Sequence, residues 1–178
     1  KKLIRELIIE IGEDPTREGL KDTPRRIADA YSEIFGGYDS DSELSVQFSE
    51  DSETVVAKNI QFYSMCEHHM LPFTGTAHIA YLPGTTGRFT GLSKLARLVE
   101  GYSRRLQVQE RLTSQIADAM QNMLDPVGVL VVVEAEHTCM SLRGVRKPGT
   151  KTVTTAARGI YRTDTQSRAE VMAFIQGR

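Results

Sequence analysis

Two cysteines and a histidine stand where they could share one metal ion. Cys66 and His69 form a C-x-x-H pair at the end of a predicted strand, so one tight turn can bring a thiolate and an imidazole together. Cys139, in the segment E-H-T-C, offers a second thiolate. Two thiolates and one imidazole suit zinc, and three protein ligands leave a fourth position open for water, as in catalytic zinc sites. The pattern predicts a catalytic zinc centre.

His137 lies two positions before Cys139 in a segment predicted to be a strand. Side chains two residues apart on a strand leave the same face of the sheet. We therefore expect His137 beside the metal, where it could move protons while the open position activates water near neutral pH.

Other interpretations of these residues stay open at this level. A free Cys is often a small buried hydrophobe, and a fourth ligand from His68 or His137 would make the zinc structural. Cys66 could instead be a nucleophile with a His base. A Cys66–Cys139 disulfide is disfavoured, since so few cysteines indicate a reducing compartment. His78 lies in an alternating strand and is interpreted as packed or solvent-facing.

Basic residues gather in two further segments. G-L-S-K-L-A-R at 91–97 places Ser93, Lys94 and Arg97 at a predicted helix start, where backbone amides favour anions. The loop at 143–151 adds Arg143 and three more cations just after E-H-T-C. Together they predict a polyphosphate site. The alternatives are a solvated basic face or an RNA-binding patch, but no aromatic residues are interleaved for base stacking.

Glu110 follows in L-Q-V-Q-E-R. Its carboxylate offers two acceptors side by side, which match the ring N–H and exocyclic amine on the edge of guanine. The alternative is a carboxylate that interacts only with a helix dipole.

Hydrophobic periodicity predicts the elements that position these residues. Helical spacing covers the first forty residues, with helix starts at Asp14–Pro15 and Asp22–Pro24. Residues 38–52, acidic and Ser-rich, are expected to be a surface linker. Beyond them we expect two strands, two helices, two strands and a helix, with a Gly-rich turn at 84–87 closing the first hairpin. The expected strands are residues 53–64, 76–83, 127–137 and 152–162. The two central helices lie within 92–124, with a bend between 101 and 108, and the last helix is 168–175.

This order favours an α+β domain with an antiparallel sheet. The chain has 178 residues, of which 40% are hydrophobic, enough for a core without disulfides. Its net charge of −1 argues against nucleic acid as a partner. No apolar run reaches the roughly 20 residues that span a bilayer. The N-terminal apolar stretch is too short and too charged for a secretion signal. Two cysteines are too few for a secreted disulfide scaffold, so a cytoplasmic location is expected.

Several long segments, in order and spacing from about Glu6 to Ile175, strongly resemble GTP cyclohydrolase I. They are F-Y-S-M-C-E-H-H-M-L-P-F, G-L-S-K-L-A-R-L-V-E, R-R-L-Q-V-Q-E-R-L-T, E-A-E-H-T-C-M-S-L-R-G-V-R-K-P-G and T-V-T-T-A-A-R-G. The resemblance implies conversion of GTP and water into 7,8-dihydroneopterin triphosphate and formate, the first step towards folate or tetrahydrobiopterin.

The resemblance also implies the tunnelling fold, a ββααββ unit with helices on one face of its sheet. An N-terminal helical segment, 1–43, would precede the catalytic domain, 44–178. The resemblance further implies a decamer of two pentamers with active sites at subunit interfaces, and a regulatory protein partner is a further expectation. Two rivals are a non-catalytic, zinc-stabilised nucleotide binder and a tunnelling-fold nitrile reductase with a nucleophilic Cys; the intact E-H-T-C segment disfavours the second.

Site residues follow from the resemblance position by position. It implies zinc ligation by Cys66, His69 and Cys139. His137 is implied as the acid for the purine imidazole ring, with His68 as a second acid or base and Ser93 as a proton carrier. The implied substrate contacts are Glu110 and Gln109 for guanine, Ser93, Lys94, Arg97 and Arg143 for the ribose triphosphate, and Arg25 or Arg26 from a neighbouring subunit.

Overall fold

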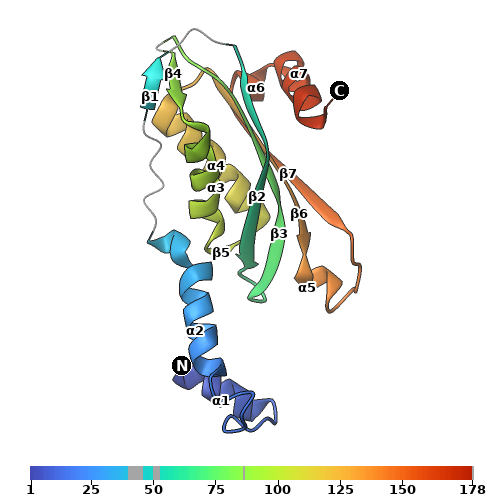
Figure 1. Ribbon diagram of the computed structural model, residues 1–178. Coiled ribbons are helices and arrows are strands. Elements are labelled where there is room, and N and C mark those ends of the chain that lie inside the picture. The colour runs from blue at the N-terminus through green and yellow to red at the C-terminus, as the bar shows by residue number, and fades with distance from the viewer. Residues whose placement is uncertain (40–45, 50–52, 86, 178) are drawn as a thin grey trace.

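A curved five-stranded sheet forms the centre of the computed structural model, which describes residues 1–39, 46–49, 53–85 and 87–177, with 46–49 as backbone only (Figure 1). Its strand order is β5-β2-β3-β6-β7. Neighbouring strands are antiparallel, except that the short β5 runs parallel to the end of β2. The bounds are β2 Val55–Cys66, β3 Leu71–Leu82, β5 Leu106–Gln107, β6 Gly128–His137 and β7 Lys151–Gly159. The predicted antiparallel α+β sheet is confirmed.

Helices α3 (Leu92–Ser103) and α4 (Gln109–Leu124) cover one face of this sheet (Figure 1). Between them β5 interrupts the helical stretch, at the position where a bend was expected. The core buries every second residue of the strands under helical side chains, because neighbouring strand residues point to opposite faces. It includes Ile79, Val129, Val131, Val133, Leu95, Leu98, Leu112, Ile116 and Met120.

The opposite face is partly covered by α6 (Ile160–Thr163) and α7 (Thr165–Gln176). Tyr161 and Val171 pack there against Leu130 and Val132, which alternate with the residues of the main core. Burial on both faces explains why β6 is almost continuously apolar in sequence.

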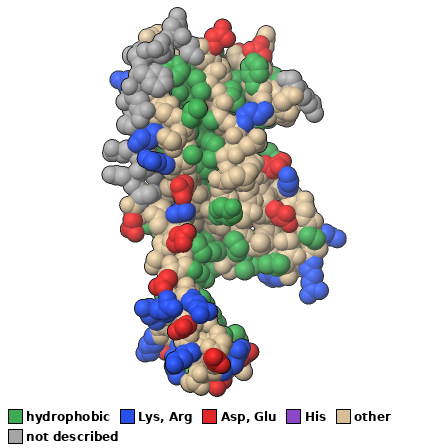
Figure 2. Space-filling view, viewed as in Figure 1, with side chains coloured by type: hydrophobic (Ala, Val, Ile, Leu, Met, Phe, Trp, Pro, Cys, Tyr) green, Lys and Arg blue, Asp and Glu red, His purple; other side chains and the backbone are tan. Residues whose placement is uncertain are grey.

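The N-terminal helices α1 (Lys2–Glu10) and α2 (Thr23–Ile34) extend away from the sheet (Figure 1). The 3₁₀ turn η1 (Gly36–Tyr38) joins them to the body, where the Gly37 amide donates to Arg104 O at 3.1 Å. Figure 2 shows charges of both signs mixed on these helices. The domain boundary between residues 43 and 44 lies outside the described residues and stays a prediction.

The first hairpin differs from the prediction. It closes at residues 67–70, where Cys66 pairs with Leu71 and Met70 takes a positive φ of 50°. The glycine-rich segment at 84–87 leads instead to β4 (Arg88–Thr90). The C-x-x-H motif of residues 66–69 therefore occupies a tight turn.

Three further predictions were wrong in part. Residues 14–19 form turns rather than a helix, because the Asp14 carboxylate accepts a hydrogen bond from the Thr16 amide at 2.8 Å. Within the expected linker, β1 (Val46–Ser49) pairs with β4, while 40–45 and 50–52 lie outside the described residues. The last strand ends at Gly159, whose φ of 57° turns the chain into α6.

No helix in the described part of the chain is both long enough and apolar enough to cross a membrane.

Candidate metal centre and active site

Three side chains converge at one end of the sheet. Cys66 ends β2, His69 lies in the hairpin turn, and Cys139 lies in the short helix α5 (Thr138–Ser141). One ligand atom from each lies within 4.8 Å of the other two, and Cys66 Sγ is 3.9 Å from His69 Nδ1. The structure thus brings together the three predicted ligands, from segments far apart in sequence.

His137 and Cys139 were predicted to share one face of a strand, and this prediction was wrong. His137 is the last residue of β6, whereas Cys139 has left the strand and lies in α5. Pairing of Phe73 with His137 across β3 and β6 brings α5 to the hairpin turn. Thr138 Oγ1 then donates to Pro72 O at 2.5 Å and holds the two segments together.

The thiols fit a cationic partner. Burial, followed by the neighbouring Cys66, raises the pKa of the Cys139 thiol above its ordinary value. The Cys139 thiol would therefore stay largely protonated at neutral pH in the absence of a cation. A divalent cation reverses that balance, since it stabilises both thiolates.

Arg143 contacts His69 on the side of the ring away from Cys66. Its Nη1 lies 3.1 Å from His69 Nε2, and because a guanidinium only donates, Nε2 acts as the acceptor. A neutral His69 would then carry its proton on Nδ1, facing Cys66. Coordination through Nδ1 would require that proton to move to Nε2 and Arg143 to move away, for example towards an anion.

His137 lies two residues before Cys139 in the chain, and Glu110 is close enough to His137 to affect its pKa. The His137 ring stacks on Phe73, with centroids 4.5 Å apart and planes 5° from parallel. Burial lowers the pKa of His137, and the Glu110 carboxylate partly offsets this. Glu110 is exposed in the first turn of α4, while Gln109 beside it is buried. His68 is exposed in the hairpin turn, with its ring 6.4 Å from that of His69.

An ion pair not predicted from the sequence supports the turn. Arg111 Nη1 and Nη2 donate to Glu67 Oε2 and Oε1 at 2.5 and 3.1 Å, which ties the start of α4 to the turn that carries His68 and His69. Both residues lie within the motifs, but the sequence contains no signal that pairs them before the strand register is known.

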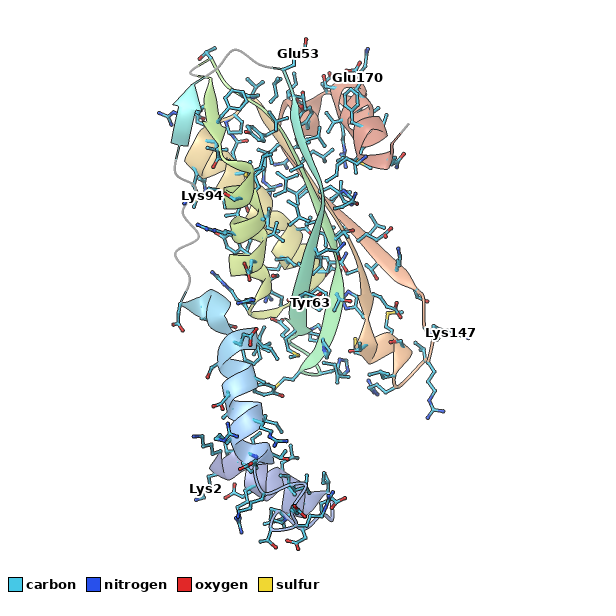
Figure 3. All side chains as sticks on the ribbon, in the orientation of Figure 1. Lys2, Glu53, Tyr63, Lys94, Lys147 and Glu170 are labelled. Carbon is cyan, nitrogen blue, oxygen red and sulfur yellow. The ribbon has the colours of Figure 1, made fainter. Side chains whose placement is uncertain are left out.

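The predicted phosphate contacts do not all gather in one chain. Ser93, Lys94 and Arg97 lie in the first half of α3, whose other end leads to β5 beside Cys66. Lys94 points outward, far from the metal end of the sheet (Figure 3). Arg25 forms a surface ion pair with Asp29 at 3.1 Å on α2. Of the predicted phosphate contacts, only Arg143 touches the metal cluster here.

A crystal structure of the archaeosine synthase QueF-Like in its apo form shares this fold, with a TM-score of 0.51 and 16% identity over 62% of this chain and 97% of that one. The fold and the site together define a tunnelling-fold protein with a two-thiol, one-imidazole cluster.

The family model for GTP cyclohydrolase I matches residues 1–176, and the chain belongs to that family. GTP cyclohydrolase 1 of Mycolicibacterium vanbaalenii is 58% identical over 175 residues, 97% of this chain and 87% of the relative. The Carboxydothermus hydrogenoformans enzyme is 58% identical over 97% of this chain and 91% of its own length. That of Geobacillus sp. is 57% identical, over 98% and 94%. The protein is therefore a hydrolase of the GTP cyclohydrolase I type.

Proposed function

We propose that the protein is a zinc-dependent enzyme that opens the imidazole ring of GTP at C8 and releases formate and 7,8-dihydroneopterin triphosphate, at the start of folate or tetrahydrobiopterin synthesis. The observation that carries the proposal is the convergence of Cys66, His69 and Cys139 within 4.8 Å, with His137 and Glu110 alongside. We assign the enzyme to the cytosol, where its two free thiols would stay reduced.

Zinc suits this donor set because it accepts two thiolates and an imidazole and keeps a fourth position open. When bound, it would supply a Lewis acid and water activated near neutral pH. The buried Cys66 and half-buried Cys139 keep their ligand atoms away from bulk water, while the exposed His69 leaves the site accessible from one side.

Substrate binding is assigned to groups that surround this opening. Glu110 would accept from the ring N–H and the amino group of guanine, which discriminates guanine from adenine by two charge-assisted hydrogen bonds. Arg143 would leave His69 for the triphosphate, and Ser93, Lys94 and Arg97 would bind the ribose triphosphate as donors.

Proton movement is assigned to His137, His68 and Ser93. His137 would protonate the imidazole ring of the purine, which makes C8 electrophilic. Its lowered pKa makes the charged form a stronger acid, suited to giving its proton away. His68 would orient water or return protons in the second hydrolysis, and Ser93 would serve the later sugar rearrangement.

A complete site would need more than one chain. Lys94 is far from the cluster within one chain, and β7 is an edge strand of the sheet (Figure 3). Large hydrophobic side chains are also exposed, among them Tyr63 at 73% and Leu92 at 70%. Free edges and exposed apolar surface favour assembly. We propose the decamer of two pentamers, with sites at subunit interfaces to which Arg25 could also contribute.

Two variants test the assignment together. The purified protein with GTP should yield formate and a product that becomes a fluorescent pterin on oxidation. Cys139→Ser should lose bound zinc and turnover together, because two remaining ligands bind zinc weakly, whereas His137→Ala should keep zinc and GTP but lose turnover by about 10²-fold or more. Elemental analysis and the formate assay are the readouts.

A zinc-replete, active Cys139→Ser protein would refute the ligand assignment, and loss of zinc in His137→Ala would make His137 a ligand.

A further inference from the structure

Gln109 has a buried side chain whose contacts are all within the protein. The residue is 1% exposed at the start of α4, next to β6 and β7. Its Nε2 donates to Val133 O and Thr152 O, each at 3.0 Å, and to Thr154 Oγ1 at 3.2 Å. Both amide hydrogens are therefore engaged before any ligand arrives.

These contacts leave one orientation for the Gln109 amide. Main-chain carbonyl oxygens only accept hydrogen bonds, so Val133 O and Thr152 O must face the NH₂ end of the amide. A flipped amide would place its own oxygen against two carbonyl oxygens in a buried site, where none of these three atoms can donate. The amide oxygen must therefore face away from both carbonyls.

That oxygen faces His137. Gln109 Oε1 lies 2.8 Å from His137 Nε2, and because an amide oxygen only accepts, Nε2 must donate. A neutral imidazole has one ring proton, so Nδ1 carries the lone pair. Within the described residues, Nδ1 has no hydrogen-bond partner, which leaves it as the nitrogen able to meet a ligand.

The neighbouring hydroxyls agree with this assignment. Thr113 Oγ1 donates to Gln109 O at 2.7 Å, so its single proton is used there. Thr154 Oγ1, 2.6 Å from Thr113 Oγ1, must then donate to it, which leaves the Thr154 oxygen free to accept from Gln109 Nε2. Each hydroxyl proton in the network has a defined acceptor, and the two amide hydrogens of Gln109 have three acceptors within reach, as expected of a buried polar network that holds one arrangement.

We propose that Gln109 is a positioning residue that holds His137 in the Nε2–H tautomer, so that Nδ1 is the atom that exchanges a proton with the ligand. Phe73 holds the ring plane while Gln109 sets its rotation. When the charged His137 gives its Nδ1 proton to a purine nitrogen, the purine gains one positive charge and the histidine becomes neutral with Nε2–H in place. The Gln109 contact survives both states, so the transfer requires no reorientation of the amide.

The tautomer of His137 follows from its contacts alone, whereas GTP as the ligand that meets Nδ1 rests on the proposed function. Magic-angle-spinning NMR of ¹⁵N-histidine-labelled, metal-loaded protein at about pH 8 reads the tautomer directly, with the His137 signal assigned by its loss in His137→Phe. The expected result is protonated Nε2 and bare Nδ1. A wild-type signal with the proton on Nδ1 would overturn the proposal, whatever the activity.

Two variants of Gln109 separate positioning from packing. Gln109→Met loses both the donors to Val133 and Thr152 and the acceptor for His137. Gln109→Glu, whose carboxyl would be protonated between these buried carbonyl oxygens, keeps one donor to them and the acceptor for His137. We expect Gln109→Glu to retain the Nε2–H tautomer and Gln109→Met to show both tautomers. Thr154→Val, which removes the two network contacts of the Thr154 hydroxyl without touching His137, is the matched control and should retain the wild-type signal. The proposal is contradicted if Thr154→Val shows both tautomers, or if Gln109→Met shows only the Nε2–H tautomer.

Kinetics give an independent readout. Gln109→Met should lower kcat for GTP about 10- to 100-fold, the usual effect of removing a partner that orients a site residue, with KM within about threefold of wild type. A raised KM with unchanged kcat would contradict the proposal and indicate that Gln109 binds guanine directly. Absence of GTP turnover in a wild type with the expected tautomer would refute the proposed function and leave the assignment of the His137 proton intact.

Discussion

Cys139, His137 and His78 are partly buried, and their surroundings shift the pKa of each. Burial raises the pKa of Cys139 and lowers that of His137, so in the absence of a cation both favour the neutral form. His78, which lies outside the cluster, is held neutral as well. Burial lowers its pKa first, and the nearby Lys58 lowers it further, against a smaller opposite effect of Glu134.

His78 should make the fold sensitive to acid. Its folded pKa lies below the ordinary 6.5, so the unfolded chain takes up a proton first as the pH falls below about 6.5. The contribution of neutral His78 to the free energy of unfolding is fully present above about pH 6.5. It is lost as the pH falls towards the lower pKa of the folded state. Urea midpoints between pH 7.5 and 5, at fixed protein concentration, should fall less steeply in His78→Gln than in wild type. Equal slopes would contradict the assignment.

At the scale of elements, the hairpin turn between β2 and β3 and the start of α4 form one unit. The turn carries His68 and His69, while α4 begins with Gln109 and Glu110. β5 pairs with the last residues of β2, and the Glu67–Arg111 ion pair closes the contact.

Arg111→Ala should weaken metal binding rather than the fold. Without the paired donors to Glu67 the turn gains freedom, and a less fixed His69 should bind zinc roughly 10-fold more weakly. Competition with a chelator measures the affinity, and thermal unfolding checks the fold. Arg17→Ala removes a similar exposed pair with Glu13 on the N-terminal segment and should leave zinc affinity unchanged. Equal zinc affinity in the two variants would rule out a role for the Arg111 pair.

The pairing of β3 with β6 requires Gly75. A Cβ there would lie 1.9 Å from Glu134 O and 2.7 Å from Ala135 Cα, both main-chain atoms that cannot yield without parting the strands. Gly75→Ala should therefore destabilise the protein by roughly 2–4 kcal/mol, measured by chemical denaturation. Gly36→Ala, whose Cβ meets nothing within 4 Å, is the control. Matching denaturation curves would show that the strands can separate at little cost.

At the scale of the whole molecule, the proposed site is divided between its two ends. The metal cluster lies where β2, β3 and β6 meet α5, while the basic residues of α3 lie towards β4 (Figures 1 and 3). A band of hydrophobic side chains runs along the body (Figure 2). Surface of this kind, next to a free strand edge, is typical of subunits that assemble.

Mixing two inactive variants tests whether the Cys66–His69–Cys139 cluster of one chain works with Lys94 of another. Lys94→Ala and Cys139→Ser should each be inactive alone, but in mixed oligomers some interfaces combine an intact metal cluster with an intact Lys94. Random mixing of equal amounts predicts recovery of about one quarter of wild-type activity. Co-expression with two affinity tags yields the mixed species, and native mass spectrometry gives its stoichiometry. No recovery in verified mixed oligomers would place Lys94 and the cluster in the same chain's site.

The sequence by itself determined the ligand types and most elements, because C-x-x-H, E-H-T-C and hydrophobic periods of two and about four are local signals. It could not show that the hairpin turns at residues 67–70, since register depends on which strands pair. Cys139 was expected on a strand and lies in α5, yet it reaches the cluster because β3 pairs with β6.

Only the tertiary structure decided the second layer of contacts around the site. The Glu67–Arg111 pair and the Gln109–His137 hydrogen bond join residues 44 and 28 positions apart, and their geometry exists only once helix and sheet are packed. Residue types restrict which hydrogen bonds a side chain can make, but the packed neighbours choose among them. The sequence could therefore nominate Gln109 and His137 as site residues, while the fold assigned the proton between them.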